Sequence, residues 1–281
     1  MEKNTVEKGA LYIVGTPIGN LGDFSPRAQE VLSEVDFIAA EDTRVTVKLL
    51  NHFDIKKPLI SYFEHNKFEK GDYICGRILA GESCALVSDA GMPAISDPGE
   101  LLVMQCAERD IPVYVVPGPS AVVSALAVSG LPTGRFSFEG FLSVNKKSRR
   151  EHLSEIKNDK RTLIFYEAPH KLIYTLKDMF EAFGDRKISI VREITKIHEE
   201  VKRTTLSEAI KFYDENSPKG EFVLVLEGAK IEEMVKEYTL EDAVALAEEK
   251  MEEGLSASEA AKFAANASKL KKGDIYRELN K

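Results

Sequence analysis

Short apolar runs alternate with amphipathic stretches over the first 230 residues of the chain. Four-residue runs of aliphatic and aromatic side chains occur at 11–14, 37–40, 84–87 and 113–116, each bounded by polar or turn-forming residues. A continuous apolar run of this length predicts a strand that is buried on both faces. Between the runs, apolar residues recur every three or four positions, which predicts helices. Strands that alternate with helices are typical of an α/β fold built around a parallel sheet.

Further runs extend this pattern toward the C-terminus. The segment 130–143, with Gly130, Pro132 and Gly134 in quick succession, reads as the crossover to a second α/β domain. The segment 192–200 reads as a loop, and a helix is expected from near Ser207. The additional strands are expected at 59–62, 162–166, 188–191 and 221–226.

From about Ile231 the pattern becomes entirely helical. Thr239 with Asp242, and Ser256 with Glu259, have the spacing of capping boxes and predict two helix starts. A break is expected near Gly273, so the last 25 residues or so resemble a helix-turn-helix, a pair that more often serves packing than nucleic-acid recognition.

A chain of 281 residues is long enough for more than one core. The expected division is an N-terminal α/β domain at 9–120, a C-terminal α/β domain at 121–230 and a helical extension at 231–281.

Three of the predicted strands end in loops that are rich in glycine, proline and acidic residues. These loops are GTPIGNLGD at 15–23, EDTR at 41–44 and SDAGMPAISDPG at 88–99. Parallel sheets bind ligands beyond the carboxyl ends of their strands. The repetition favours a ligand crevice over the alternative of three unrelated turns.

The loop at 88–99 is expected to be stiff. Gly91 permits close approach of the backbone to a ligand, whereas Pro93 and Pro98 fix φ. Asp97 and Pro98 suit the N-cap and first position of a following helix, and PGPS places Ser120 at the start of another.

Charge is unevenly distributed around a net value of −8. Residues 232–253 carry nine acidic and two basic side chains, whereas 142–161 carry seven basic and three acidic ones. Residues 255–281 are also basic, with six basic and three acidic side chains. The two basic segments together permit an RNA partner, whereas either one alone is better explained as a solvated helix face.

Several classes of protein are disfavoured by what the sequence contains. The longest apolar runs fall far short of the roughly 20 residues that span a bilayer, and the N-terminal MEKNTVEKGA is polar, so a cytoplasmic protein with no membrane partner is expected. The three cysteines lack metal-ligand spacing and no metal is expected. The glycines at 15, 19 and 22 match neither the dinucleotide fingerprint nor the phosphate loop.

Six motifs together carry a specific resemblance, and they stand in this order: GTPIGNLGD, AAEDTR, SDAGMPAISDPG, VPGPSA, EAPHK and REITKIHEE. This set resembles the ribosomal RNA small subunit methyltransferase I family, the 2′-O-ribose methylases of the tetrapyrrole-methylase superfamily, over about residues 11–228. The tetrapyrrole methylases themselves read Gly-Asp-Pro in the central loop. Here that position is Gly91-Met92-Pro93, which argues against a porphyrinoid substrate.

The resemblance implies two α/β domains with S-adenosyl-L-methionine in the cleft between them, a homodimer, and the small ribosomal subunit with its 16S rRNA as partner. The implied reaction is methyl transfer to the ribose 2′-hydroxyl of a cytidine in the decoding region. The cofactor-binding residues carried over from the family motifs are Pro17, Ile18, Asp89, Ala90, Gly91, Met92, Ile95, Ser120, Ala121, Glu167 and Ala168.

The candidate general bases are Glu41, Asp42 and Asp97. For Asp97 a helix N-cap is the favoured interpretation, and for Glu41 an ion pair with Arg44 is an alternative. Candidate contacts to RNA come from the branch-specific motifs and the basic helix: Arg44, His170, Lys196, Lys146, Lys147, Arg149 and Arg150. For Lys196 a surface ion pair is an equal alternative.

Two other functions remain open at this stage. A tetrapyrrole methyltransferase would use the same fold on a macrocycle, and a non-catalytic ribosome-binding factor would use the basic helices alone. Binding of S-adenosyl-L-methionine separates an enzyme from the second of these.

Overall fold

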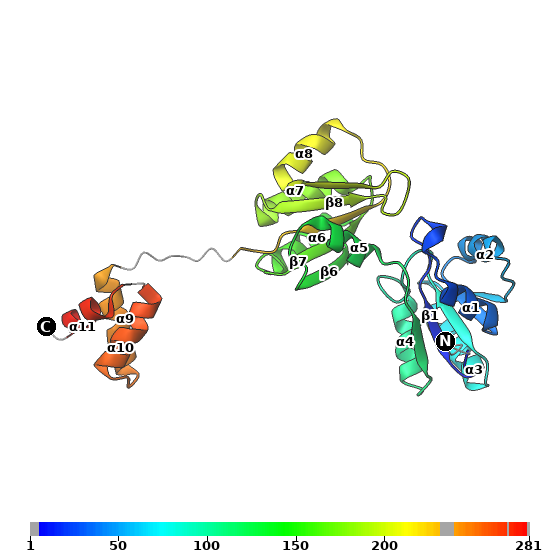
Figure 1. Ribbon diagram of the computed structural model, residues 1–281, viewed down its shortest axis with the longest axis horizontal. Coiled ribbons are helices and arrows are strands. Elements are labelled where there is room, and N and C mark those ends of the chain that lie inside the picture. Colours follow the sequence, from blue (N-terminus) through cyan, green and yellow to red (C-terminus); the bar gives the residue numbers. More distant parts are fainter. Residues whose placement is uncertain (1–5, 231–238, 269, 280–281) are drawn as a thin grey trace. The chain divides into compact units, whose positions relative to one another are not determined.

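The computed structural model describes residues 6–230, 239–268 and 270–279 (Figure 1). Five parallel strands form the first sheet, in the order β3-β2-β4-β1-β5. Their bounds are β1 (Leu11–Val14), β2 (Phe37–Ala40), β3 (Leu59–Ser61), β4 (Cys84–Val87) and β5 (Val113–Val116). Four of these strands have the bounds that the apolar runs predict, and β3 is one residue shorter.

Helices cover both faces of the first sheet, as the continuous apolar strands require. Alternate strand residues pack against α1 (Pro26–Glu34) and α2 (Thr43–His52) on one face. The intervening residues pack against α3 (Lys67–Leu79) and α4 (Gly99–Ala107) on the other. A short 3-10 helix, η1 (Leu21–Asp23), lies in the loop after β1.

The second sheet is mixed and has the order β6-β7-β10-β8-β9. Strands β6 and β7 pair in parallel, and the other neighbours are antiparallel. The strands are β6 (Phe136–Phe141), β7 (Thr162–Glu167), β8 (Lys187–Arg192), β9 (Glu200–Thr205) and β10 (Phe222–Leu226).

One face of the second sheet packs on α5 (Ala121–Ser129), through Val122, Ala125 and Leu126. The other face holds a larger core beneath three helices. These helices are α6 (Lys146–Glu155), α7 (Leu172–Phe183) and α8 (Leu206–Glu215). Both sheets belong to one compact unit, Met1–Ala229, and the division at residue 120 stays a prediction.

Two strands of the second sheet were not expected from the sequence. Strand β6 lies in the segment read as a crossover, and β9 follows the segment read as a loop. Both are edge strands, and β9 is largely polar, with the sequence EVKRTT. An edge strand buries little of its surface, so the apolar pattern that marks a central strand is weak there.

The second unit, Lys230–Lys281, contains three helices in its described part: α9 (Leu240–Glu252), α10 (Ala257–Ser268) and α11 (Lys272–Leu279). The capping box of Thr239 with Asp242 is present, and Ser256 and Glu259 exchange the corresponding hydrogen bonds. The break expected near Gly273 is confirmed, because α10 ends at Ser268 and α11 begins at Lys272; Gly273 itself lies in the first turn of α11. Residues 231–238 of the expected extension lie outside the described residues.

In the described part of the chain, none of the helices has the length and apolar character that a membrane crossing requires.

Candidate active site

A cavity of about 590 Å³ lies at the carboxyl ends of the first sheet's strands and is closed by the second sheet. This volume falls in the range of small-molecule sites. The first sheet's loops contribute Ile18, Glu41, Ser88, Asp89, Ala90, Gly91, Met92, Ile95, Ser96 and Asp97. The remaining lining residues are Ser120, Ala121, Phe141, Tyr166, Glu167, Ala168, Pro169, His170, Val191, Ile194, Glu221, Phe222 and Val223.

The loops that line the cavity are joined to one another by backbone packed on backbone. Thr16 and Gly91 exchange two N–H···O bonds of 2.9 and 3.1 Å, which join the first loop to the central loop. A Cβ on Gly15 would lie 2.6 Å from Cα of Gly118, so the loop after β5 also touches the first loop without room for a side chain. The N–H of Gly118 in turn donates to Sδ of Met92 at 3.3 Å.

The central loop is held in an unusual conformation. Ala94 and Ser96 both have a φ of +67°, a left-handed backbone that costs free energy outside glycine. Oδ1 of Asp97 accepts hydrogen bonds from the N–H groups of Ala94 at 3.0 Å and Gly99 at 2.7 Å. The helix α4 begins at Gly99, one residue after the expected Pro98. Asp97 still caps its first turn, through the N–H of Gly99.

Carboxylates concentrate on the first sheet's side of the cavity. Burial raises the pKa of Glu41, and the negative charge of Asp89 raises it further. Burial also raises the pKa values of Asp89 and Asp97. The N–H of Asp89 approaches Oε2 of Glu41 at 3.5 Å, and Oδ1 of Asp89 accepts from the N–H of Asp42 at 3.0 Å. These groups tie the loops after β2 and β4 together.

All of the predicted cofactor-binding residues except Pro17 line this one cavity. Sequence reasoning missed two kinds of lining residue. Ser88, Ser96 and Pro169 lie within the motifs SDAGMPAISDPG and EAPHK, so they could have been predicted from their position beside the residues that were chosen. Most of the others are strand residues of the second sheet, such as Val191 and Val223, whose apolar character predicts only a core position. Ile194 and Glu221 lie just outside β8 and β10.

The three candidate bases separate clearly in space. Glu41 and Asp97 line the cavity, whereas Asp42 does not. Asp42 caps α2 through the N–H of Arg44 at 2.8 Å and pairs with the Arg44 guanidinium. That side-chain hydrogen bond lowers the pKa of Asp42 to about 2.

The candidate RNA contacts also divide. His170 lines the cavity. Arg44 lies at the start of α2, directly after the loop that follows β2, and its side chain is exposed. Lys196 donates to Glu193 and Glu221, both at 2.9 Å, and its aliphatic stem lies against Gly19. Lys196 thus joins the second sheet's loop to the first loop.

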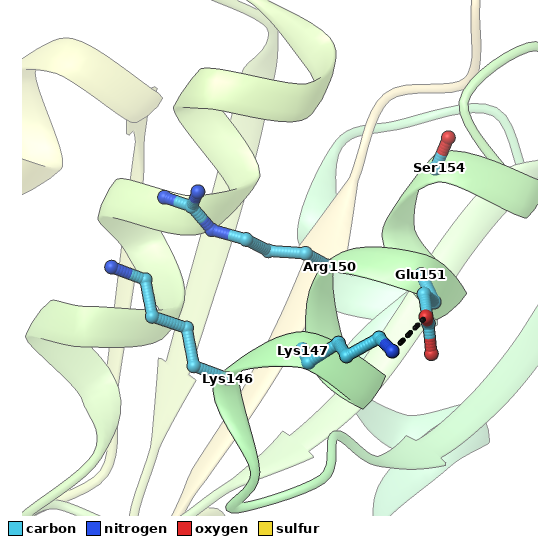
Figure 2. Close-up of a pocket in the computed structure, with 5 residues that line it drawn as sticks. All are labelled: Lys146, Lys147, Arg150, Glu151 and Ser154. Carbon is cyan, nitrogen blue, oxygen red and sulfur yellow. Dashed lines mark ion pairs between the residues drawn. The ribbon is translucent and has the colours of Figure 1, made fainter.

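The basic helix α6 presents only part of its charge outward. Lys146, Lys147 and Arg150 line an open hollow together with Glu151 and Ser154. Figure 2 shows Lys146 and Arg150 projecting from α6 toward one side, whereas Lys147 turns toward Glu151. Arg149 faces α7, where it pairs with the buried carboxylate of Asp178 at 2.6 Å; the two side chains are 11% and 7% exposed. The half-exposed Arg150 shares this carboxylate at 3.1 Å and also pairs with Glu181.

Comparison with known proteins agrees with this geometry. A model of the family described as tetrapyrrole (corrin/porphyrin) methylases matches residues 10–210. A protein named ribosomal RNA small subunit methyltransferase I from Synechocystis sp. is 47% identical over 270 residues, covering 96% of each chain. The chain belongs to the ribosomal RNA small subunit methyltransferase I family, within the tetrapyrrole methylases.

Other relatives support the same assignment. The protein of the same name from Bacillus subtilis is 44% identical over 275 residues, covering 96% of this chain and 94% of the relative. The one from Thermotoga maritima is 50% identical over 220 residues, which cover 78% of this chain and 99% of that relative. That family member therefore has almost nothing beyond the matched region.

Solved structures show the same fold at low identity. Uroporphyrin-III-C-methyltransferase from Thermus thermophilus has a TM-score of 0.55 and 18% identity, covering 77% of this chain and 94% of the other. Diphthine synthase has a TM-score of 0.57 and 14% identity, covering 78% of this chain.

As a member of a methyltransferase family, the chain uses S-adenosyl-L-methionine as methyl donor. The cavity fits this cofactor. Glu41, Asp89 and Asp97 supply negative charge for a sulfonium cation, and Ile18 and Met92 supply apolar surface. The first turn of α5 has no side-chain cap at Ser120, so its N–H groups can bind an anionic end of the ligand.

Among the described residues, no group of three or more His, Cys, Asp or Glu side chains is arranged to hold a metal ion.

We expect Arg149→Ala to lower the free energy of unfolding by about 1.5–3 kcal/mol, because it removes the more buried of the two guanidinium groups that pair with the Asp178 carboxylate and leaves only Arg150, at 3.1 Å. Lys147→Ala, on the same helix but 85% exposed, should change the free energy by less than about 0.5 kcal/mol. Urea denaturation of both variants measures the difference. Equal free energies of unfolding in the two variants would show that the ion pair of Arg149 with Asp178 does not stabilise the packing of α6 on α7.

We expect Gly91→Val to raise the Kd for S-adenosyl-L-methionine by about tenfold or more, measured by calorimetry. Gly91 has a φ of +86° and a Cβ there would lie 3.3 Å from Cγ2 of Ile18, so the loop must shift where it lines the cavity. Gly81→Val is the matched control, because Gly81 has a φ of +96° away from the cavity. If both variants bind the cofactor as the wild type does, the loop does not form the cofactor site.

Proposed function

We propose that this protein transfers a methyl group from S-adenosyl-L-methionine to the ribose 2′-hydroxyl of a cytidine in the decoding region of small-subunit (16S) rRNA. The observation that carries the proposal is the 47% identity, over 96% of both chains, with a protein named ribosomal RNA small subunit methyltransferase I. The cavity supports it, because it gathers the motif residues of several loops in one ligand-sized space.

The chain's main contribution to the reaction is alignment. The bound cofactor supplies a methyl group already activated on a sulfonium. The pairing of Thr16 with Gly91 and the close approach of Gly15 to Gly118 fix the loops before any ligand arrives. Correct positioning of reacting groups contributes about 7–11 kcal/mol, more than the 10²–10⁴-fold of a positioned base.

We assign the proton-accepting role to Glu41. Both Glu41 and Asp97 line the cavity and have raised pKa values, which improves a base at neutral pH. Oδ1 of Asp97, however, is engaged by two backbone N–H groups at 2.7 and 3.0 Å that hold the loop. Within the described part of the chain, the one hydrogen bond to the Glu41 carboxylate comes from the N–H of Asp89 at 3.5 Å, which leaves this carboxylate freer to accept a proton.

The RNA is proposed to approach over the rim that carries Arg44 and His170, with Lys146, Lys147 and Arg150 of α6 as phosphate contacts. Arg149 would act indirectly by anchoring α6 on α7. Lys196 would act in the same manner, because it fixes the loop at 193–199 against Gly19.

We further propose a homodimer that works in the cytoplasm, as the family resemblance implies. Strand β5 is an edge strand with Val115 53% exposed. Met104 of α4 and Val123 of α5 are also more than half exposed. Exposed apolar surface beside an unpaired strand edge is suited to burial by a second copy.

The reaction is tested with matched substrates in assembled small subunits, one with the natural ribose at the target and one with 2′-deoxyribose. We expect methyl incorporation into the first and none into the second, because the acceptor oxygen is missing. Blocking the ring nitrogens of the target base should leave the acceptor available. Equal incorporation into both sugars would mean that a base is modified and would refute the proposed reaction.

We expect Glu41→Gln to lower kcat by about 10²–10⁴-fold and to remove the acidic limb of the pH profile. The pKa of Glu41 is higher in the folded protein than in the unfolded chain, because burial disfavours the ionised carboxylate. Ionised Glu41 therefore destabilises the fold at a pH above both of these pKa values, and this destabilisation is absent at a pH below both. The variant should therefore also have a higher Tm at about pH 7, a gain that disappears at about pH 4. Asp42→Asn is the control, and an unchanged kcat in Glu41→Gln would exclude Glu41 as the base.

A further inference from the structure

An exposed aromatic ring stands at the cavity wall with no role in the site as described so far. Phe141, the last residue of β6, lines the cavity and is 57% exposed. Large aromatic side chains are normally among the more buried residues of a domain. A phenylalanine that is both exposed and part of a ligand cavity presents a flat apolar face to a ligand that binds there.

The backbone directs this ring to its position. The register of β6 against β7 shifts between Phe138 and Gly140, which is a β-bulge, and Gly140 has a φ of +65°. Bulges beside active sites re-aim a side chain. A Cβ on Gly140 would lie 3.6 Å from Oγ of Ser96, so the bulge brings the end of β6 beside the strained central loop that carries Asp97.

The ring is also supported from behind. Its centroid lies 5.3 Å from that of Tyr166, at an interplanar angle of 56°. Tyr166 in turn packs edge-on against Phe138 at 4.9 Å. Three rings from two neighbouring strands thus form a small aromatic cluster. Of the three, only Phe141 is largely exposed to solvent.

We propose that Phe141 is the stacking platform for the nucleobase of the target nucleotide, which leaves its own stack when the ribose enters the cavity. This inference rests on the proposed function and deepens it. A 2′-hydroxyl is reached most readily in an unstacked segment, and enzymes that act inside an RNA or DNA stack extrude the nucleotide. An aromatic face replaces the stacking that the base loses, for any base, because every base has a π-face.

A double-mutant cycle tests the proposal, with Phe141→Ala as one change and removal of the target base as the other. The substrates are assembled small subunits with either cytidine or an abasic riboside at the target, both keeping the 2′-hydroxyl. On cytidine we expect Phe141→Ala to lower kcat/KM by about 5- to 150-fold. On the abasic target the wild type and the variant should have equal rates, because there is no base to stack.

Two variants serve as controls on the same strand. Phe136→Ala removes a 41% exposed ring from the other end of β6, away from the cavity, and should leave kcat/KM on both substrates as in the wild type. Phe141→Tyr keeps the π-face and should restore the rate on cytidine. Thermal unfolding should be nearly unchanged in all three, because the substituted rings are exposed.

The outcomes distinguish the proposal from its premise. A loss of the same factor on cytidine and abasic targets, or a weaker Kd for S-adenosyl-L-methionine in Phe141→Ala, would overturn the stacking role and place the ring against the cofactor or in the fold. A fully active Phe141→Ala would overturn it too. In each case the wild type would still methylate the ribose, whereas a wild type that does not would contradict the proposed function itself.

Discussion

The site depends on the close packing of three strand-end loops, backbone against backbone. Gly15 and Gly118 touch at a distance that leaves no space for a Cβ, and Thr16 and Gly91 form a two-bond bridge beside them. The loops after β1, β4 and β5 therefore occupy one fixed arrangement. Side chains that approach a ligand, such as Ile18 and Met92, are placed by this backbone contact rather than by their own packing.

Whereas this backbone packing stabilises the loops, the negative charge in the cavity destabilises the protein when no ligand is bound. Glu41, Asp89 and Asp97 share a partly buried space in which burial raises the pKa of each. A cationic ligand relieves this cost, since an opposite charge stabilises the ionised carboxylates. Binding of a sulfonium therefore offsets the destabilisation that the three ionised carboxylates cause, so the stability of the fold and the affinity for the ligand are coupled.

The sequence predicts the first sheet well because its central strands are buried on both faces and show unbroken apolar runs. Most of the cavity's loops could also be predicted, since Gly91, Asp97 and Ser120 have backbone roles that their residue types reveal. Of the second sheet's contribution, Glu167 and Ala168 were predicted from the EAPHK motif, whereas lining residues such as Phe141 and Val223 were not. Phe141 is placed by a bulge, and the inward direction of Arg149 depends on a partner 29 residues away on another helix. Such long-range contacts leave no periodic signal.

The position of β1 in the first sheet also has a consequence for biosynthesis. This strand leaves the ribosome before the other strands of its sheet, yet its neighbours, β4 and β5, begin only at residues 84 and 113. At translation rates of about 5–20 residues per second, the backbone N–H and C=O groups at its two edges stay without their strand partners for seconds. The first and central loops acquire their places only when those later strands dock. The catalytic cavity is consequently a late product of folding, and an incompletely synthesised chain exposes the strand while lacking the site.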